Sequence, residues 1–509
     1  MTDVGLSIIE GVANGGAAYR DPAKRNIGLL GQFIRGVALT PIKVTSMEEF
    51  NNAFGGQSSS FYGPGIVRSI FKEAGNASVT LFLARVVGTG AAVATAIGTI
   101  NNQDESTTDD EAISITMTAT AAYRGQEDPG AWANGIKVTI YPFGSQVRGQ
   151  YTLRIAYKDK VETYNYATLS EIQVAVNKTS KYITVEFSGE DVAHTITQES
   201  TITLAGGVEG TVTESDFYPS EVSNVKRGLD CFEGADVQIV AITEYHSLTM
   251  ARVFNTWLNK IGSPVGVINL PWAADENTAE LYADALQTAG ISFLAGAYPG
   301  WAKVPDDNGN AQLLPVIGPV LGAAYLRTPY VQGDFIHIPP GGADSVFNYV
   351  TEVIGSTFSQ GTINRLVQQL SCNPIIYEDN FGYYVGSSRT YSTNALYCSI
   401  HIRQQTSFYK RALLGRMRFM IQKPNTPELR NAALYELHRF FKTEYDNGAL
   451  ERSVSFDEAY IGICDSTNNP VGQDRKLVNI DVQWIPTECT ESVQISLQRN
   501  DGSLTATEN

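Results

Sequence analysis

Cysteine and histidine are scarce in this chain of 509 residues, which contains five of each. The cysteines form no CxxC pair and their spacing excludes a disulfide-dense scaffold or a zinc ribbon; they are Cys231, Cys372, Cys398, Cys464 and Cys489. We expect inert thiols, and the odd number of cysteines leaves an intermolecular disulfide open.

The five histidines are His194, His246, His337, His401 and His438. They occur in no HExxH motif, and no serine or cysteine has the glycine context of a nucleophile elbow. A triad can still form from distant residues, but we expect structural histidines, no catalytic residue and no metal site.

Positive charge is also in short supply, because 37 Lys and Arg against 53 Asp and Glu give a formal net charge of −16. Such a surface repels nucleic-acid phosphates and anionic lipids, so we expect neither as a partner.

Long apolar runs are missing as well. Residues 1–20 lack a basic start and an apolar segment, and the best run, 315–326, is broken by Pro319 and two glycines. We therefore expect no signal peptide and no membrane insertion, and a soluble product made in a cytoplasm.

Two short motifs resemble ligand sites but lack a required part. Gly88-Thr-Gly90-Ala-Ala-Val93 follows a strand like a dinucleotide fingerprint, yet its sixth residue is Val and a strand-like pattern follows where a helix is needed. Asp306-Asp-Asn-Gly-Asn310 carries oxygen ligands without the register and closing Glu of a calcium loop, which favours a hairpin turn. We expect no cofactor.

What the sequence does contain is a clear alternation of strands and helices. Residues 27–33 are typical of a buried strand, Ser46 and Glu49 form a capping box, and Pro64 opens an apolar helical pattern that precedes a strand at 79–87. The same texture returns after residue 217, with strands at 237–242, 265–270 and 291–297 and helices at 246–261 and 278–288. This order predicts a mainly parallel, doubly wound sheet.

Between these stretches, from Ala112 to about Leu204, the pattern alternates polar and apolar residues and predicts an all-β block, a sandwich or small barrel. An acidic run, 104–111, marks a domain junction. The all-β block is therefore an insertion into the α/β region, or its neighbour.

The two ends of the chain have patterns of their own. Residues 6–10 predict one short strand without a local partner, and 478–484 and 493–497 predict two alternating strands. Thr426 and Pro427 open a helix that ends before Gly448 and has one apolar face.

A series of motifs in this order along the chain resembles the contractile tail sheath proteins of phages and related injection systems. They are Gly31–Gly36, Pro41–Ser46, Phe50, Phe54–Gly56, Arg85–Val86, Asp128–Gly135, Tyr298–Trp301, Pro315, Gly322, Arg327–Gly333, Pro339–Pro340, Asn364, Asn373, Val385–Thr390, Ile400–Arg403, Lys423–Asn425, Gly448–Leu450, Cys464–Asp465 and Asn468–Pro470. No single motif is specific enough to indicate the family. The resemblance rests on the motifs occurring in the family's order over most of the chain. From Glu488 onward the sequence departs from the usual Pro-Ala-Glu run.

The resemblance implies a subtilisin-like α/β core without a catalytic triad, an inserted outer β domain and extended terminal arms. It implies a non-enzymatic subunit that stacks in six-fold rings around a tail tube and contracts to drive the tube through a cell envelope. Its partners would be its own copies, the tube protein, and baseplate and terminator proteins, in a virion tail assembled in a host cytoplasm. A subtilisin-like serine hydrolase, inactive or active, a tube protein and a capsid protein are the alternatives, and a phage is not distinguished from an injection system.

We accordingly divide the chain into an N-terminal arm (1–22), the first α/β part (23–95), the inserted β domain (96–210), the α/β core (217–395), a C-terminal core region (396–475) and the C-terminal strands and arm (476–509). We expect strand pairing between subunits at Leu6, Ile8, Glu10, Val478, Ile480, Val482, Trp484, Val493, Ile495 and Leu497. Arg439 and Lys442, on the polar face of the helix at 427–447, are the candidate tube contacts, with an ordinary solvated face as the alternative.

Overall fold

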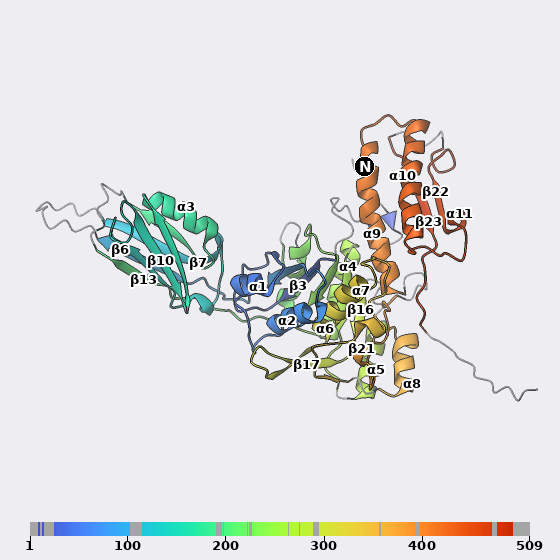
Figure 1. Cartoon of the computed structure of the whole chain (residues 1–509), viewed down its shortest axis with the longest axis horizontal. Coiled ribbons are helices and arrows are strands. Elements are labelled where there is room, and N and C mark those ends of the chain that lie inside the picture. Colours follow the sequence, from blue (N-terminus) through green and yellow to red (C-terminus); the bar gives the residue numbers. More distant parts are fainter. Residues whose placement is uncertain are drawn as a thin grey trace, which may run out of the picture. The chain divides into compact units, whose positions relative to one another are not determined.

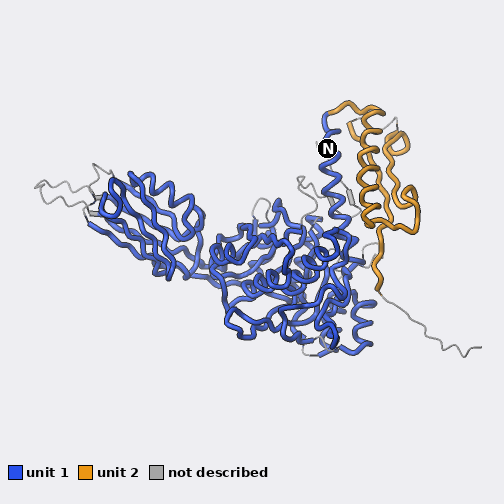
Figure 2. The backbone as a smooth tube through the Cα atoms, viewed as in Figure 1, with its two compact units in different colours: residues 1–422 blue, residues 423–509 orange. Residues whose placement is uncertain are grey.

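The computed structural model divides the chain into two compact units, residues 1–422 and 423–509 (Figure 2). It describes residues 25–101, 114–189, 198–220, 226–262, 264–273, 275–288, 295–355, 358–392, 398–470 and 476–491, with 9, 10, 13, 14, 196 and 222. Among these residues no helix is both long and apolar enough to cross a bilayer.

A six-stranded sheet forms the centre of the first unit (Figure 1). Its strands are β3 (Ile27–Gly31), β4 (Ile42–Val44), β5 (Leu81–Arg85), β14 (Ile239–Ile242), β15 (Val265–Asn269) and β16 (Ala295–Tyr298), in the order β16-β15-β14-β3-β5-β4. All neighbours are parallel except β4 and β5. The five parallel strands therefore have the doubly wound order 2-1-3-4-5, with the switch point between β3 and β14. The predicted parallel sheet is confirmed.

Successive residues of the strands point to opposite faces of this sheet, and both faces are apolar. Each face therefore packs against helices and forms its own apolar cluster. Leu29 belongs to one cluster and Leu30 to the other. The first cluster is closed by α2 (Tyr62–Ala74), α6 (Ile317–Val320) and the π-helix η4 (Leu321–Arg327); the second by α4 (Leu248–Ile261) and α5 (Glu276–Thr288). Ser46 caps α1 (Met47–Phe54) as predicted, by accepting a hydrogen bond from the Glu49 N–H, but the Glu49 carboxylate accepts from Thr45, so the full capping box is not formed.

An inserted β domain separates β5 from β14 in the sequence. One antiparallel sheet has the order β11-β10-β9-β13, and the other has the order β12-β7-β6 with β8 paired to β7. Both enclose a single apolar core. The strands are β6 (Thr95–Asn101), β7 (Ser114–Tyr123), β8 (Gln126–Glu127), β9 (Lys137–Tyr141), β10 (Tyr151–Tyr157), β11 (Lys160–Tyr166), β12 (Ile183–Ser188) and β13 (Ser200–Thr203).

The expectation that this block is entirely β was wrong, because it contains α3 (Leu169–Thr179). Thr168 and Glu171 form a reciprocal capping box, and Ile172 and Val176 point into the domain core. The signal was present in the sequence as Thr168 followed three residues later by Glu171.

The rest of the first unit consists of short elements and one long helix. They include α7 (Thr328–Val331), β17 (Trp301–Pro305), β18 (Ala311–Pro315), β19 (Glu352–Ile354), α8 (Gln360–Asn364), the π-helix η6 (Arg365–Gln369), β20 (Ile375–Glu378), β21 (Gly382–Val385) and α9 (Ile400–Arg416). Every side chain of α9 from Ile400 to Leu414 is buried, so it has no apolar stripe for a sequence pattern to show. The segment at 306–310 is the predicted hairpin turn between β17 and β18, where Asp306 accepts backbone hydrogen bonds from Asn308 and Asn310.

The second unit is a helix packed on a small sheet. Its elements are α10 (Pro427–Asp446), α11 (Phe456–Ala459), β22 (Tyr460–Ile463) and β23 (Asp481–Trp484). Thr426 caps α10 by accepting a hydrogen bond from the Leu429 N–H, which confirms the predicted helix.

Several elements begin or end elsewhere than expected. The helix expected from His246 starts at Leu248, since Ser247 is its N-cap, and the strand expected at 478–484 covers only 481–484. The strand expected at 291–297 is described from Ala295 to Tyr298, and residues 291–294 lie outside the described residues. Residues 6–8 and 493–497 lie outside the described residues.

Candidate assembly surface

The sheet of the second unit has two strands within the part of the chain that the structure describes. β22 and β23 run antiparallel, with Tyr460 opposite Trp484 and Gly462 opposite Val482. Two predicted pairing residues, Val482 and Trp484, therefore find an intrachain partner. Val478 and Ile480 precede the strand and are half-buried.

The hydrogen-bond pattern shows which way the backbone of β23 faces. The Ile485 N–H donates to the Ala459 carbonyl, so residues 459 and 485 form a hydrogen-bonded pair of the ladder. Bonded and non-bonded pairs alternate in antiparallel sheets, which places the pair Gly462 and Val482 among the non-bonded ones. The N–H and C=O of Val482 thus point away from β22, toward the outer edge of the sheet.

One face of this sheet rests on α10 through stacked aromatic rings. Phe441 lies parallel to Tyr460 at a centroid distance of 4.6 Å, and Phe456 stacks on the same tyrosine at 5.5 Å. The buried side of α10 is the predicted apolar face, with Ala433, Leu437, Phe440 and Phe441, to which the structure adds Glu444.

The opposite face of the sheet exposes aliphatic side chains. Ile461 is 46% exposed and Ile485 is 45% exposed. Since Ile485 lies opposite Ala459, two residues before Ile461, both side chains project from the same face. A two-stranded sheet with an outward-facing edge and an apolar outer face has the features of an acceptor for further strands.

The N-terminal candidates are only partly visible. Glu10 lies in β1 (Ile9–Glu10) and pairs with Ala13 of β2 (Ala13–Asn14) in a short antiparallel hairpin, so the expectation of a strand without a local partner was wrong for these two residues. Leu6 and Ile8, like Val493, Ile495 and Leu497, lie outside the described residues. Pairing of these residues with other subunits stays a prediction.

The two candidate tube contacts lie on the exposed side of α10 and pair within that helix. Arg439 donates to Glu436 at 2.8 Å and its side chain is 60% exposed; Lys442 pairs with Asp446 and its side chain is 46% exposed. Lys442 also lies 5.3 Å from the centroid of the Tyr445 ring. Exposed helix pairs of this kind contribute about 0.3–0.5 kcal/mol each, so neither cation is needed to hold the fold together.

At the switch point of the main sheet, where doubly wound proteins bind ligands, the chain places its own carboxylate. Glu244, just after β14, accepts hydrogen bonds from the backbone N–H groups of Tyr62 and Gly63 at 2.8 and 3.0 Å. These are the first N–H groups of α2, which would otherwise attract an anion. Burial raises the pKa of Glu244 to about 7, and the two N–H donors act against that rise.

A small cavity lies near the end of β14. It has a volume of about 20 Å³ and lies between α4 and the ends of β14 and β15, lined by His246, Ser247 and Asn269 among others. It has space for about one water molecule. Burial lowers the pKa of His246 to about 4, so this imidazole is neutral at pH 7. No group of His, Cys, Asp and Glu among the described residues is arranged to hold a metal ion.

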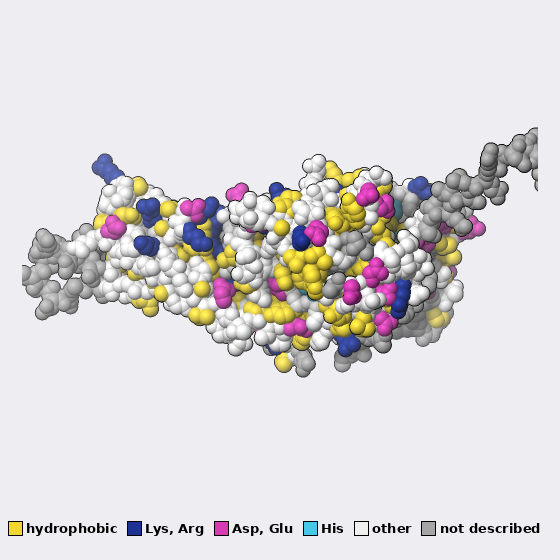
Figure 3. Space-filling view, turned by 90° about the horizontal axis from the view of Figure 1, so that it is seen from below, with side chains coloured by type: hydrophobic (Ala, Val, Ile, Leu, Met, Phe, Trp, Pro, Cys, Tyr) yellow, Lys and Arg dark blue, Asp and Glu magenta, His cyan; other side chains and the backbone are white. Residues whose placement is uncertain are grey.

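Three of the five thiols are buried, as the sequence led us to expect. Cys231, Cys372 and Cys464 are buried, and burial raises the pKa of each thiol. Cys398 and Cys489 are half-buried. On the face drawn in Figure 3 the described Lys and Arg side chains are scattered and form no continuous stripe.

No family model matches the sequence, and no curated protein matches it. Solved structures do match, along nearly the whole chain. The sheath tail protein of Listeria innocua is 12% identical, with 92% of this chain and 96% of that chain covered and a TM-score of 0.58. The sheath tail protein of Desulfitobacterium hafniense is 13% identical, with coverages of 92% and 98% and a TM-score of 0.54.

A third match is an assembled particle, the sheath complex of the extracellular contractile injection system PVC in its contracted state. It is 11% identical, both chains are covered to 98%, and the TM-score is 0.53. The chain has the tail-sheath fold. The sheath fold thus comprises the parallel sheet and its helices, the inserted β domain and the second unit, since the matches cover more than nine-tenths of the chain.

Proposed function

We propose that this protein is a structural sheath subunit, which polymerises into a six-fold helical sheath around a tail tube and contracts to drive that tube through a cell envelope. The observation that carries the proposal is the near-complete structural match to sheath proteins, one of them in a contracted assembly. The sheet of the second unit, which has two strands among the described residues, supports it, because a subunit of a helical array needs a surface that accepts its neighbours.

In this proposal the terminal arms hold the array together while the cores move. Residues 6–10 and 493–497 add strands to the β22–β23 sheets of neighbouring copies, whereas β23 itself pairs with β22 of its own chain. Each main-chain hydrogen bond formed this way contributes about 0.5–1.5 kcal/mol net. Arms anchored by several such bonds keep subunits connected while the α/β cores rotate and slide, and contraction repacks core against core with more buried contact. The conformation of each subunit biases the conformation of the next, so contraction triggered at one end propagates along the array.

We also propose that the α/β core is a subtilisin-like domain that has no catalytic role. The carboxylate of Glu244 fills the helix N-terminus at the switch point, and the cavity near the end of β14 has space for about one water molecule. The partners of the sheath would be its own copies, the tube protein, and the baseplate and terminator proteins, in a virion tail assembled in a host cytoplasm. The sheath of an injection system is the second candidate, favoured by the match to the PVC sheath.

Deleting residues 1–20 tests the arm mechanism. The truncated chain should remain a soluble monomer with the circular dichroism of the full chain, because the deleted segment precedes the first core strand at Ile27. Negative-stain electron microscopy distinguishes the outcomes. Long tubes formed by the truncated chain would refute the mechanism.

A further inference from the structure

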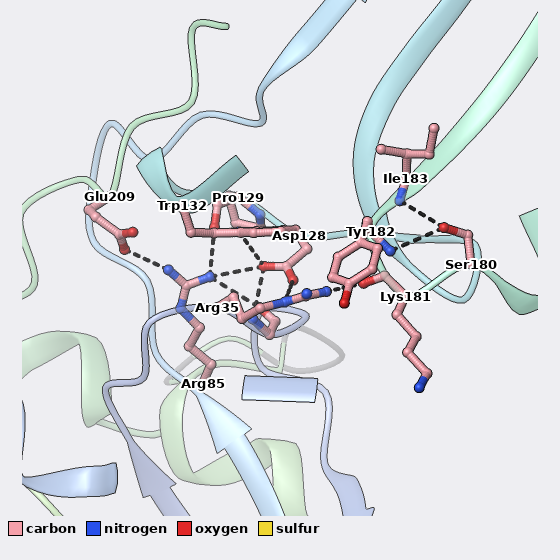
Figure 4. Close-up of polar contacts among 11 residues, drawn as sticks. Arg35, Arg85, Asp128, Pro129, Trp132, Ser180, Lys181, Tyr182, Ile183 and Glu209 are labelled. Atoms are coloured by element: carbon pink, nitrogen blue, oxygen red, sulfur yellow. Dashed lines mark hydrogen bonds and ion pairs between the residues drawn. The ribbon is translucent and has the colours of Figure 1, made fainter. Parts of the chain in front are cut away.

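A buried ionic cluster joins the inserted β domain to the α/β core (Figure 4). Its centre is Asp128, a residue of the inserted domain with no exposed surface. One of its carboxylate oxygens accepts hydrogen bonds from the Gly36 N–H at 2.8 Å, Arg85 Nη1 at 3.1 Å and Trp132 Nε1 at 3.1 Å; the other accepts from Arg35 Nε at 3.2 Å. Three of the four donors belong to core segments that follow β3 or end β5.

The two arginines of this cluster reach further into the inserted domain. The Arg35 guanidinium lies 3.9 Å from the centroid of the Trp132 ring and also donates to the Lys181 carbonyl. Arg85 donates to the Pro129 carbonyl at 2.6 Å and pairs with Glu209 at 2.5 Å. Both guanidinium groups are almost fully buried. Two arginines thus face two carboxylates, the buried Asp128 and Glu209, whose side chain is 40% exposed.

Only two chain segments link the inserted domain covalently to the α/β core. The chain enters the inserted domain and returns as a two-stranded ribbon, held by bridges between Thr89 and Thr211 and between Ala92 and Val208. Gly88 lets the strands approach closely, since a Cβ there would meet the Thr211 carbonyl carbon at 2.1 Å. A two-stranded ribbon alone is marginally stable and bends easily.

We propose that the Asp128 cluster is a lock that fixes the orientation of the inserted domain on the core, so that the two domains move as one body. Charge-assisted hydrogen bonds are directional, and a small rotation of the inserted domain would break several of them at once and leave buried arginines without a counter-charge. The inference does not depend on the proposed function, because it concerns a joint within one chain.

Spin-label distance measurements on the full chain test the lock. Labels are placed on exposed helix positions by Val174→Cys in α3 and Arg252→Cys in α4, with Cys398 and Cys489 replaced by serine. The parent should give a narrow distance distribution. Asp128→Asn removes the charge at the centre and should broaden the distribution about twofold or more, because Arg35 then lacks its ionic partner in the inserted domain.

Glu162→Gln is the matched control. Glu162 accepts hydrogen bonds from the Ser180 hydroxyl at 2.7 Å and the Lys181 N–H at 3.1 Å, both within the inserted domain. This variant should keep the narrow distribution. Equal broadening by Glu162→Gln and Asp128→Asn would overturn the proposal, as would an unchanged width in a folded Asp128→Asn chain. Should Asp128→Asn fail to fold, Arg35→Lys decides. It keeps the positive charge on the core side but loses the guanidinium that bonds both Asp128 and the Lys181 carbonyl, and a width equal to that of the control would refute the lock.

Discussion

Burial and a helix N-terminus shift the pKa of the Glu244 carboxyl group in opposite directions. Burial favours the protonated form, and the N–H groups of Tyr62 and Gly63 favour the ionised form. The net result is a pKa raised from 4.5 to about 7. The folded state therefore holds this proton more tightly than the unfolded state. The stability from protonation is fully present below about pH 4.5 and is lost as the pH rises through about 7.

Glu244→Gln should remove this dependence, because glutamine keeps an oxygen for both N–H donors and does not ionise. Relative to wild type, the variant should gain about 3 kcal/mol of unfolding free energy across the titration, since a tenfold change in proton affinity is worth about 1.4 kcal/mol. Urea unfolding of both chains between pH 5 and 8 measures most of the effect. Stability curves that stay parallel with pH would show that Glu244 does not titrate in this range.

Sequence reasoning did not find Glu244, and no local signal pointed to it. Gly63 and Glu244 are 181 residues apart, and they meet only because β3 and β14 are neighbours in the sheet. The absence of a nucleophile motif was visible in the sequence. The group that fills the helix N-terminus depends on strand order, which local periodicity does not encode.

Among the secondary-structure elements, the success of prediction depends on whether the signal is local. For α10 a cap, a proline and a stripe of apolar residues all lie within the helix itself, and the prediction is confirmed. For α3 a capping box was also present, but the alternating patterns on both sides of it led us to predict strands throughout the segment. For β23 the alternation was visible, whereas its partner β22 lies in another segment and could not be predicted.

The outer edge of β23 is the element on which the assembly mechanism depends most. Val482→Pro removes an N–H that points away from β22, so it should leave the β22–β23 pair formed, as prolines are tolerated at strand edges. We expect an unchanged circular dichroism spectrum and no tubes in electron micrographs. Val482→Thr keeps the N–H and should form tubes like the wild type. Tubes formed by the proline variant would mean that this edge accepts no strand.

The exposed face of α10 allows a test of tube recognition. Reversing both charges with Arg439→Glu and Lys442→Glu should abolish assembly that depends on the tube, while the helix loses about 1–2 kcal/mol, because two attractive pairs become repulsive. Co-sedimentation with the tube protein measures the effect. Glu436→Gln with Asp446→Asn is the control, because it removes the same intrahelical pairs but keeps both cations. Full co-sedimentation of the charge-reversed chain would assign this face to solvent.

At the scale of the whole molecule, the parallel sheet could be predicted from the order of strands and helices, and the block inserted between β5 and β14 was visible as a change of pattern. The strand order 2-1-3-4-5 and the pairing within the inserted sheets could not be predicted, because they depend on contacts between distant segments. The motifs that resembled tail sheath proteins were therefore the stronger guide to the whole chain. The structural matches confirm the fold that those motifs indicated.

The central claim is that copies of this chain pair through strands at their ends and so build a lattice that shortens without coming apart. Cryo-electron microscopy of the purified full-length protein tests it most directly. The account predicts helical tubes with six-fold symmetry, in which density for the chain ends of one subunit continues the β22–β23 sheet of the next. Discrete particles, each with both ends folded onto its own body, would contradict it.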